Sequence, residues 1–470
     1  MKVLGLWNNN RYYVKLYVST MPEEMSVGEH KKGKGHLSWW GLALLGLGFT
    51  TGTGFFLGSS IAIEKSGFSI LLLFLIAAVC TYFVFDALAN MIAQHAEEGS
   101  FRTYSKKAFG RWSGFSHGWM YWSSEILILG SQLTAIGLFT RFWFSDTPLW
   151  LLTAIYALLG VVIVLFGTAG FEKAENVFAI VKVSAIVLFI ALALLVIPGV
   201  LGKENAHIHE PQSMDHFFTG GAMGMWTALI YVFFAFAGIE VMGLMAAELK
   251  QPKEAPKSGK VMLTIITILY VASMGLTLLL APLDKFNTNE SPFVTALKDL
   301  KFTPVVHVFN GVLIIAGFSS LVASLFAVTQ MMANMAKTGD APKLLSKRTK
   351  RKLPYASLLL TIGGMIVSII TALVLPDKVF EYLTTAGGLM LLYSWLFIVF
   401  ASRKLLKLTA WGQIKTIIAV AMILLAAAGT LFDKISRPGF FISLGFLVVL
   451  GAVTWIMTRR WKREEEASEA

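Results

Sequence analysis

The sequence is poor in charged residues and almost free of cysteine, and each shortage excludes a class of protein. Only 14% of its 470 residues are charged, whereas 56% are hydrophobic. Soluble domains carry roughly 25% charged residues, so this chain cannot cover itself with a polar surface in water. Its one cysteine, Cys80, can form neither an intramolecular disulfide nor a cysteine metal cluster. We interpret Cys80 as a small packing residue inside an apolar run.

Motifs for nucleotide-driven or metal-dependent chemistry are also missing. No Walker A pattern occurs, so ATP does not drive this protein directly. His207, His209 and His216 share one loop with Glu210, where solvated histidines explain the pattern better than a metal site. The net charge of +12 comes from short loops between apolar runs rather than from one basic face, which argues against a nucleic acid partner. We therefore expect no cofactor and no metal.

Apolar runs long enough to cross about 30 Å of hydrocarbon recur along the whole chain. These runs predict an all-α integral membrane protein of about twelve transmembrane helices, which crosses the cell membrane many times. The predicted spans are 39–63, 68–93, 114–143, 149–168, 175–199, 222–247, 260–282, 303–336, 355–375, 379–402, 411–431 and 438–458.

The distribution of lysine and arginine predicts the orientation of these spans. With the N-terminus inside, the cytoplasmic segments carry 30 of the 40 basic residues, the outer loops carry nine, and Lys182 falls inside the fifth span. The positive-inside rule then places both termini in the cytoplasm. Residues 1–35 and 459–470 are expected to be cytoplasmic tails, with no signal peptide and with Met25 as an alternative natural start.

Glycines crowd the first predicted span, with four in the nine residues from Gly46 to Gly54. Three interpretations are open for this segment. A dinucleotide fingerprint would need a preceding strand and a βαβ unit, and neither is predicted. Small residues could instead serve close helix packing. Alternatively, the helix is broken at mid-membrane, so that unwound N–H groups and a helix N-terminus face an anion.

A second glycine lies in an apolar run in the sixth span and favours the broken-helix interpretation. The segment Phe234–Glu240 places Gly238 close to an acid, Glu240. The first and sixth spans are five helices apart. Paired interruptions at corresponding positions of two halves are typical of transporters built from inverted repeats, with the substrate site between the interruptions.

Eight short motifs follow one another in order over about 300 residues. Together they resemble the amino acid–polyamine–organocation superfamily, and most of all its bacterial amino acid transporter family. The motifs are TTGTGFF (Thr50–Phe56), EEGSFRTYS (Glu97–Ser105), GWMYW (Gly118–Trp122), SQLTAIG (Ser131–Gly137), ENVFAIVKV (Glu175–Val183), FAFAGIE (Phe234–Glu240), AAELKQPKEAPKS (Ala246–Ser258) and AKTGDAPK (Ala336–Lys343).

The resemblance implies an architecture and an activity. It implies a ten-helix core over residues 36–402, built as two five-helix inverted repeats at about 36–199 and 222–402, with broken helices 1 and 6. Two additional transmembrane helices follow at 403–458. The implied activity is secondary transport of amino acids by alternating access, with proton-coupled uptake preferred and amino acid exchange as the alternative.

The resemblance also implies a substrate site made largely of backbone groups. In similar transporters, exposed amides of the first break hold the substrate carboxylate and freed carbonyls hold its ammonium group. Donors and acceptors at opposite ends suit a zwitterion, and broken helices supply both. Phe234 would close over the substrate as a gate, although plain packing or lipid contact would also explain it. The amides map to Gly52, Thr53 and Gly54, and the carbonyls to Thr50, Phe234 and Ala237.

Three ionisable residues inside the spans are candidates for proton coupling. A lysine in a membrane helix is costly, so Lys182 is either functional or a snorkelling residue that reaches the inner interface. The resemblance places it where sodium-coupled relatives bind an ion, between spans 1, 5 and 8. Glu240 is either a second titrating group or a packing acid. Glu125 has no family counterpart. Its depth in the membrane is similar to that of Lys182, so the two could form an ion pair or share a proton; alternatively, Glu125 binds Ser123, Ser124 or a water, or touches the substrate.

Some residues depart from the family pattern, and other protein classes compete. Gln132 stands where the family usually has Glu, and Gln330 where it often has Arg. A polytopic membrane enzyme would need an acid/base cluster at a helix end, and a channel would need rings of repeated polar residues; the sequence has neither. Because only Glu125 offers a counter-charge to a basic side chain, we expect a neutral amino acid as substrate.

Overall fold

Helices build the whole architecture in the computed structural model, which describes residues 37–97, 99–166, 168–199, 208–299, 303–349, 353–375 and 378–469. Within these ranges the only other regular pairing is an isolated parallel β-bridge between Leu37 and Leu249. Nine stretches of this part of the chain are long and apolar enough to cross a membrane, and shorter apolar helices add to them. The predicted all-α membrane fold is confirmed, while the predicted tail 1–35 lies outside the described residues.

Every predicted span coincides with a helix or with consecutive short helices. The first span consists of α2 (Trp39–Thr50), α3 (Thr53–Phe56) and α4 (Gly58–Ser66), and the sixth consists of α11 (Gly221–Phe234) and α12 (Ile239–Met245). The other spans are α5 (Ile70–Gln94), α7 (Arg111–Arg141), α8 (Leu149–Leu165), α9 (Thr168–Val196), α13 (Ala255–Leu280), α15 (Thr303–Lys337), α16 (Tyr355–Val374), α17 (Val379–Leu405), α18 (Ala410–Phe432) and α19 (Arg437–Glu469).

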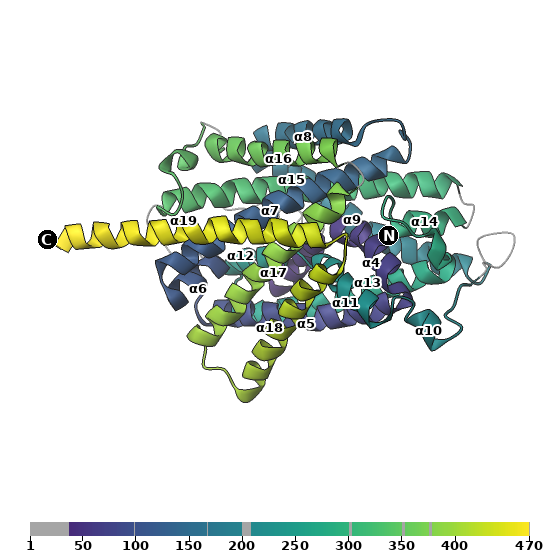
Figure 1. Ribbon diagram of the computed structural model, residues 1–470, viewed down its shortest axis with the longest axis horizontal. Coiled ribbons are helices and arrows are strands. Elements are labelled where there is room, and N and C mark those ends of the chain that lie inside the picture. Colours follow the sequence, from purple (N-terminus) through teal and green to yellow (C-terminus); the bar gives the residue numbers. More distant parts are fainter. Residues whose placement is uncertain are drawn as a thin grey trace, which may run out of the picture.

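The helix α7 lies at the centre of the bundle. It contacts α8, α15, α16, α17 and α19. Of its most apolar stretch of 18 residues, 94% is buried inside the protein. Small residues such as Gly130 and Gly137 let neighbouring helices approach, because a Cβ at either position would lie within 3.0 Å of a side chain of α16 or α8. In Figure 1, α8 and α16 lie together along the upper side of the bundle, with α15 and α7 beneath them.

The outer helices expose apolar side chains that suit a lipid environment. Val367 on α16 is 63% exposed and Val448 on α19 is 65% exposed. A surface of this kind would be unfavourable in water but matches hydrocarbon. The helix α19 is longer than its predicted span and projects from the bundle in Figure 1. Its extension past 458 is rich in helix-forming charged residues and includes an i,i+4 pair between Arg460 and Glu464.

Both predicted helix breaks are present. The helix α2 ends at Thr50, and the extended residues Thr51 and Gly52 separate it from α3. The helix α11 ends at Phe234, and α12 begins after Gly238, which has φ +107°. A left-handed φ of this kind strains any residue with a Cβ, so glycine is the residue that permits this second break.

Candidate functional site

The two helix breaks touch each other through their backbones. A Cβ built on Gly54 would lie 2.7 Å from Cδ1 and 2.9 Å from the carbonyl oxygen of Phe234. A Cβ on Gly238 would lie 3.0 Å from the carbonyl oxygen of Phe49. All three distances are shorter than normal carbon contacts, so only glycine allows this approach without displacing the opposite chain.

One hydroxyl joins the two breaks from a third helix. The Tyr270 hydroxyl, on α13, lies 3.1 Å from the carbonyl oxygen of Thr50 and 3.1 Å from that of Ala235. These carbonyls belong to the ends of α2 and α11, where helix geometry supplies no N–H partner. Tyr270 is held in place by Phe55, whose ring stacks on it with centroids 3.7 Å apart. The contact ties both breaks to the same point of the scaffold.

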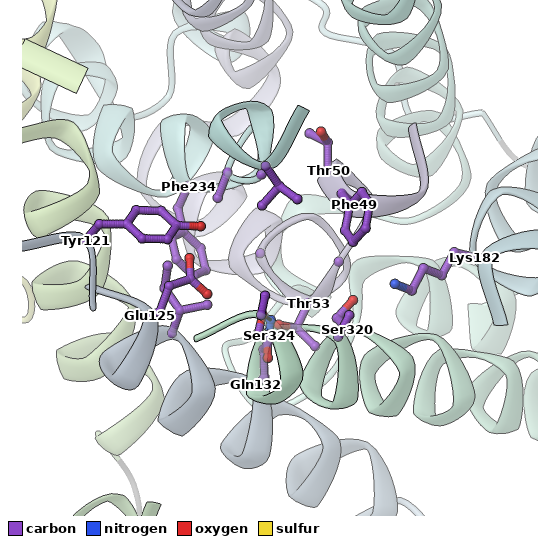
Figure 2. A pocket seen from close by; sticks show the side chains of 18 residues that line it. Phe49, Thr50, Thr53, Tyr121, Glu125, Gln132, Lys182, Phe234, Ser320 and Ser324 are labelled. Carbon is purple, nitrogen blue, oxygen red and sulfur yellow. Dashed lines mark hydrogen bonds between the residues drawn. The ribbon is translucent and has the colours of Figure 1, made fainter. Parts of the chain in front are cut away.

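A cavity of about 70 Å³ lies between the breaks and the helices around them. Figure 2 shows Thr50 and Phe234 of the broken helices on one side of this cavity and Ser320 and Ser324 of α15 on the other, with Thr53 beside the two serines. Eight of the nine predicted site residues line it, which places them together as expected from their motifs: Thr50, Gly52, Thr53, Gly54, Phe234, Ala237, Lys182 and Glu125.

The central helix α7 contributes a polar face to the cavity. Tyr121, Glu125, Ile128 and Gln132 line it, and their spacing of three or four residues puts them on one side of the helix. Side chains of Tyr121 and Ser324 hydrogen-bond to the Glu125 carboxyl group. The Gln132 amide nitrogen donates to Ser324 Oγ at 3.4 Å.

Two buried oxygens at this cavity have no hydrogen-bond partner among the described residues. They are Gln132 Oε1 and Thr50 Oγ1, on side chains that are 7% and 3% exposed. A buried polar atom without a partner costs about 1–3 kcal/mol, so its persistence needs an explanation. Both atoms accept hydrogen bonds, and a ligand that brings N–H or O–H groups into the cavity would satisfy them.

Lys182 reaches the cavity from α9. Its side chain is 1% exposed, and its ammonium group donates to the Gly48 carbonyl of α2 at 3.4 Å. The helix α9 packs on both α2 and α15, so Lys182 lies among spans 1, 5 and 8 as the family resemblance implies. This buried position differs from the snorkelling alternative, in which the ammonium group would reach the interface.

Glu240 lies beside the cavity rather than on it. Its carboxyl group accepts a hydrogen bond from the Gly238 amide at 3.1 Å and another from Trp395 Nε1 at 3.3 Å. The residue is 1% exposed and is close enough to interact electrostatically with Glu125. It therefore fixes the start of α12 directly, through the Gly238 amide.

The possible ion pair between Glu125 and Lys182 is not formed among the described residues. Figure 2 shows the two side chains on opposite sides of the cavity, with the first break between them. The Glu125 carboxyl group contacts Tyr121 and Ser324, whereas Lys182 contacts Gly48. Similar depth along α7 and α9 was a necessary condition for pairing, but the broken helix α2–α3 separates the two faces.

Sequence reasoning missed several residues that shape this site. Tyr270 gave only a weak signal, as the one aromatic residue of a span that also carries the hydroxyls of Thr264, Thr267, Ser273 and Thr277. Tyr121 precedes Glu125 by one helical turn, so the acid at 125 already marked the same face. Ser320 and Ser324 of α15 lie on the cavity wall as well.

Comparisons with known proteins give a family match for the chain. The family model for amino acid permeases matches residues 41–467. The chain is 54% identical over 436 residues to the uncharacterized transporter YcgH of Bacillus subtilis, covering 93% of this chain and 98% of that protein. It is 30% identical to the aromatic amino acid transport protein AroP of Corynebacterium glutamicum, with 88% and 93% covered. It is also 30% identical to the L-asparagine permease of Salmonella typhimurium, with 79% and 76% covered.

Proposed function

Since the chain belongs to the amino acid permease family, we propose that it carries a neutral amino acid across the cell membrane together with a proton. The family consists of membrane transporters rather than enzymes, so amino acid transport itself follows from membership. Proton coupling, the neutral substrate and inward transport are our proposals. So are the cytoplasmic termini, the two-repeat core over 36–402 and the two added helices over 403–458.

The single observation that carries the proposal is the cavity between the two helix breaks. The helix α3 begins at Thr53, and the first N–H groups of a helix have no partner within it. Such groups favour a carboxylate. The carbonyl groups of Thr50 and Phe234 lie at the ends of α2 and α11, where they favour an ammonium group. A zwitterionic amino acid needs both kinds of group within a few ångströms, and the cavity offers both.

The polar face of α7 supports a neutral side chain that carries hydrogen-bond donors. Among the described residues, Gln132 Oε1 is buried without a partner, Glu125 adds acceptors, and no basic residue lines this wall. A substrate amide or hydroxyl would satisfy Gln132, whereas an aliphatic side chain would leave it unsatisfied. One relative named above is an asparagine permease, and asparagine has such an amide. We therefore expect asparagine, glutamine, serine and threonine to compete better than leucine or valine.

Lys182 is the residue we propose for proton coupling. Burying an ammonium group inside the membrane is costly, which makes a lysine at this position a candidate for a functional role. Lysine can lose its proton when buried, and it would then release its hold on α2. Because Lys182 contacts the Gly48 carbonyl of α2, proton loss would loosen the helix that carries the first break. Glu125 and Glu240 provide further proton-binding groups on the opposite wall.

Uptake by the purified protein in proteoliposomes tests this function. We expect labelled neutral amino acid to accumulate when the interior is alkaline, and to stop accumulating when the gradient is removed. Lys182→Ala should lose gradient-driven accumulation while keeping exchange against internal amino acid. The control Lys415→Ala removes a partly buried lysine that pairs with Asp86 away from the cavity, and it should leave coupling unchanged. Accumulation that needs only internal amino acid and ignores pH would show an exchanger and overturn the symport proposal.

A further inference from the structure

A second hollow lies on the side of the bundle, away from the amino acid cavity. It is a groove of about 770 Å³ whose floor is α17 and whose walls come from the α6–α7 junction and from α19. Tyr393, Phe397 and Phe400 form the floor, with Trp112 on one wall and Leu447 on the other. The helix α6 (Ser100–Phe109) and the helix α19 each contact α17, so the groove is bounded by packed helices.

Two cations close one end of this groove. Arg403 and Lys404 belong to the last turn of α17 and line the groove together with its apolar residues. The Lys404 ammonium lies 5.9 Å from the ring centre of Phe109, so its stem follows the groove wall. Both cations are exposed, and neither forms an ion pair with a described residue. The cations therefore present positive charge to a partner outside the chain.

The length of the groove limits which kind of molecule can occupy it. Along α17, Tyr393 and Lys404 are separated by about 16 Å of helix rise. That distance is about half of the roughly 30 Å hydrocarbon core, so the groove covers one leaflet. A transmembrane helix of a second chain would need the full thickness. At the far end, the Tyr393 hydroxyl and Ser443 Oγ are 3.4 Å apart and partner each other, which leaves the floor apolar.

We propose that this groove binds one anionic glycerophospholipid. Its acyl chain would lie on the aromatic floor between α19 and the α6–α7 junction, and its phosphate would contact Arg403 and Lys404. Basic pockets between transmembrane helices recognise anionic headgroups in this way. Trp112, which is 44% exposed at the cationic end, suits the membrane–water interface. The site is separate from amino acid transport and does not depend on the proposed substrate.

Native mass spectrometry of the purified full chain tests the proposal. The probes are phosphatidylglycerol and phosphatidylcholine with the same acyl chains, titrated after delipidation. We expect one phosphatidylglycerol to be retained preferentially. The variant Arg403→Gln/Lys404→Gln should lose this preference, by about fivefold for each cation removed. The control Lys253→Gln/Lys260→Gln removes the same charge from exposed positions outside the groove, and should retain the lipid.

A second variant keeps the test decisive if the charge variant folds poorly. Leu447→Trp leaves both cations in place but fills the groove from α19, so it should also release phosphatidylglycerol. Retention that survives this change would mean that the cations bind the headgroup alone, and would overturn the acyl-chain part of the proposal. Equal retention of both lipids by the unaltered protein would overturn the proposal as a whole. So would a dimer of the unaltered chain that Leu447→Trp dissociates, because a second chain would then occupy the groove.

Discussion

At the scale of single residues, the cavity separates one buried cation from two buried acids. Lys182 contacts α2, whereas Glu125 lies on the opposite wall and interacts electrostatically with Glu240. Charges buried without a partner cost several kcal/mol, so each of these groups depends on its own hydrogen bonds. The Glu240 carboxyl group accepts hydrogen bonds from Trp395 and the Gly238 amide. The Glu125 carboxyl group hydrogen-bonds to Tyr121 and Ser324. The two acids should therefore respond to mutation as a pair, and Lys182 should respond independently.

Double-mutant cycles measure this grouping. Glu125→Gln combined with Glu240→Gln should be non-additive in unfolding free energy by about 0.5–3 kcal/mol, because neutralising one acid relieves repulsion on the other. Glu125→Gln combined with Lys182→Met should be additive within about 0.5 kcal/mol, since no ion pair joins them. Thermal or denaturant unfolding of each single and double variant provides the comparison. Strong coupling between Glu125 and Lys182 would contradict the arrangement of the cavity.

At the scale of helices, the two breaks are held by elements that do not line the cavity. The Tyr270 hydroxyl contacts the ends of both α2 and α11, so the helix α13 fixes the position of one break relative to the other. The glycines at 54 and 238 then allow the chains to meet. A transporter that moves one of these helices has to break a Tyr270 contact or carry α13 along.

Tyr270→Phe tests this registration. The ring would still stack on Phe55, but two carbonyl groups would lose their shared donor, which costs about 1–3 kcal/mol when the groups stay buried. We expect a roughly tenfold loss of amino acid affinity in a binding assay, together with a lower melting temperature. Tyr104→Phe is the matched control. Tyr104 lies on α6, outside the cavity, and its hydroxyl donates to the His95 carbonyl at 2.6 Å. Equal losses in both variants would reduce Tyr270 to a packing residue.

The helices themselves were largely predictable, whereas their rotations were not. Most span boundaries agree within a few residues because hydrophobic length decides them, as for the predicted 303–336 and the observed Thr303–Lys337. The start of α9 and the end of α19 are exceptions, because both helices extend further than the predicted spans. Short helices in the loops between the spans were harder to predict, and α6 and α14 (Pro292–Asp299) were not predicted. The possible ion pair of Glu125 with Lys182 is not formed, because depth along two helices says nothing about which faces meet. Family motifs placed the site residues near each other, but gave no account of Tyr270.

At the scale of the whole molecule, one buried acid ties three helices together at one end of the bundle. Asp340, which is 1% exposed, accepts from Arg102 Nη2 at 2.9 Å and from Arg111 Nε at 3.4 Å. Its own carbonyl accepts from Trp119 Nε1 at 2.9 Å. Asp340 follows α15, while Arg102 belongs to α6 and the other two residues to α7. The contact joins the α6 segment to the helices that line the cavity.

Asp340→Ala should therefore destabilise the protein strongly. Removing one partner of a buried charge pair strands the other, which costs about 3–5 kcal/mol. A melting curve in detergent should show a large shift. The control Glu97→Ala removes the exposed partner of Lys107, and such surface pairs contribute roughly 0–1 kcal/mol. Comparable shifts for the two variants would mean that Asp340 does not hold the three helices together.

The central claim is that an amino acid binds where the two broken helices meet, and uptake of labelled neutral amino acid by two alanine variants tests it most directly. A Cβ at Gly54 would meet the Phe234 ring and carbonyl, whereas a Cβ at Gly58, four residues further along, meets nothing within 4 Å. Both variants should insert and fold. We predict that Gly54→Ala abolishes uptake and that Gly58→Ala transports normally. Uptake by Gly54→Ala at the unaltered rate would contradict the claim.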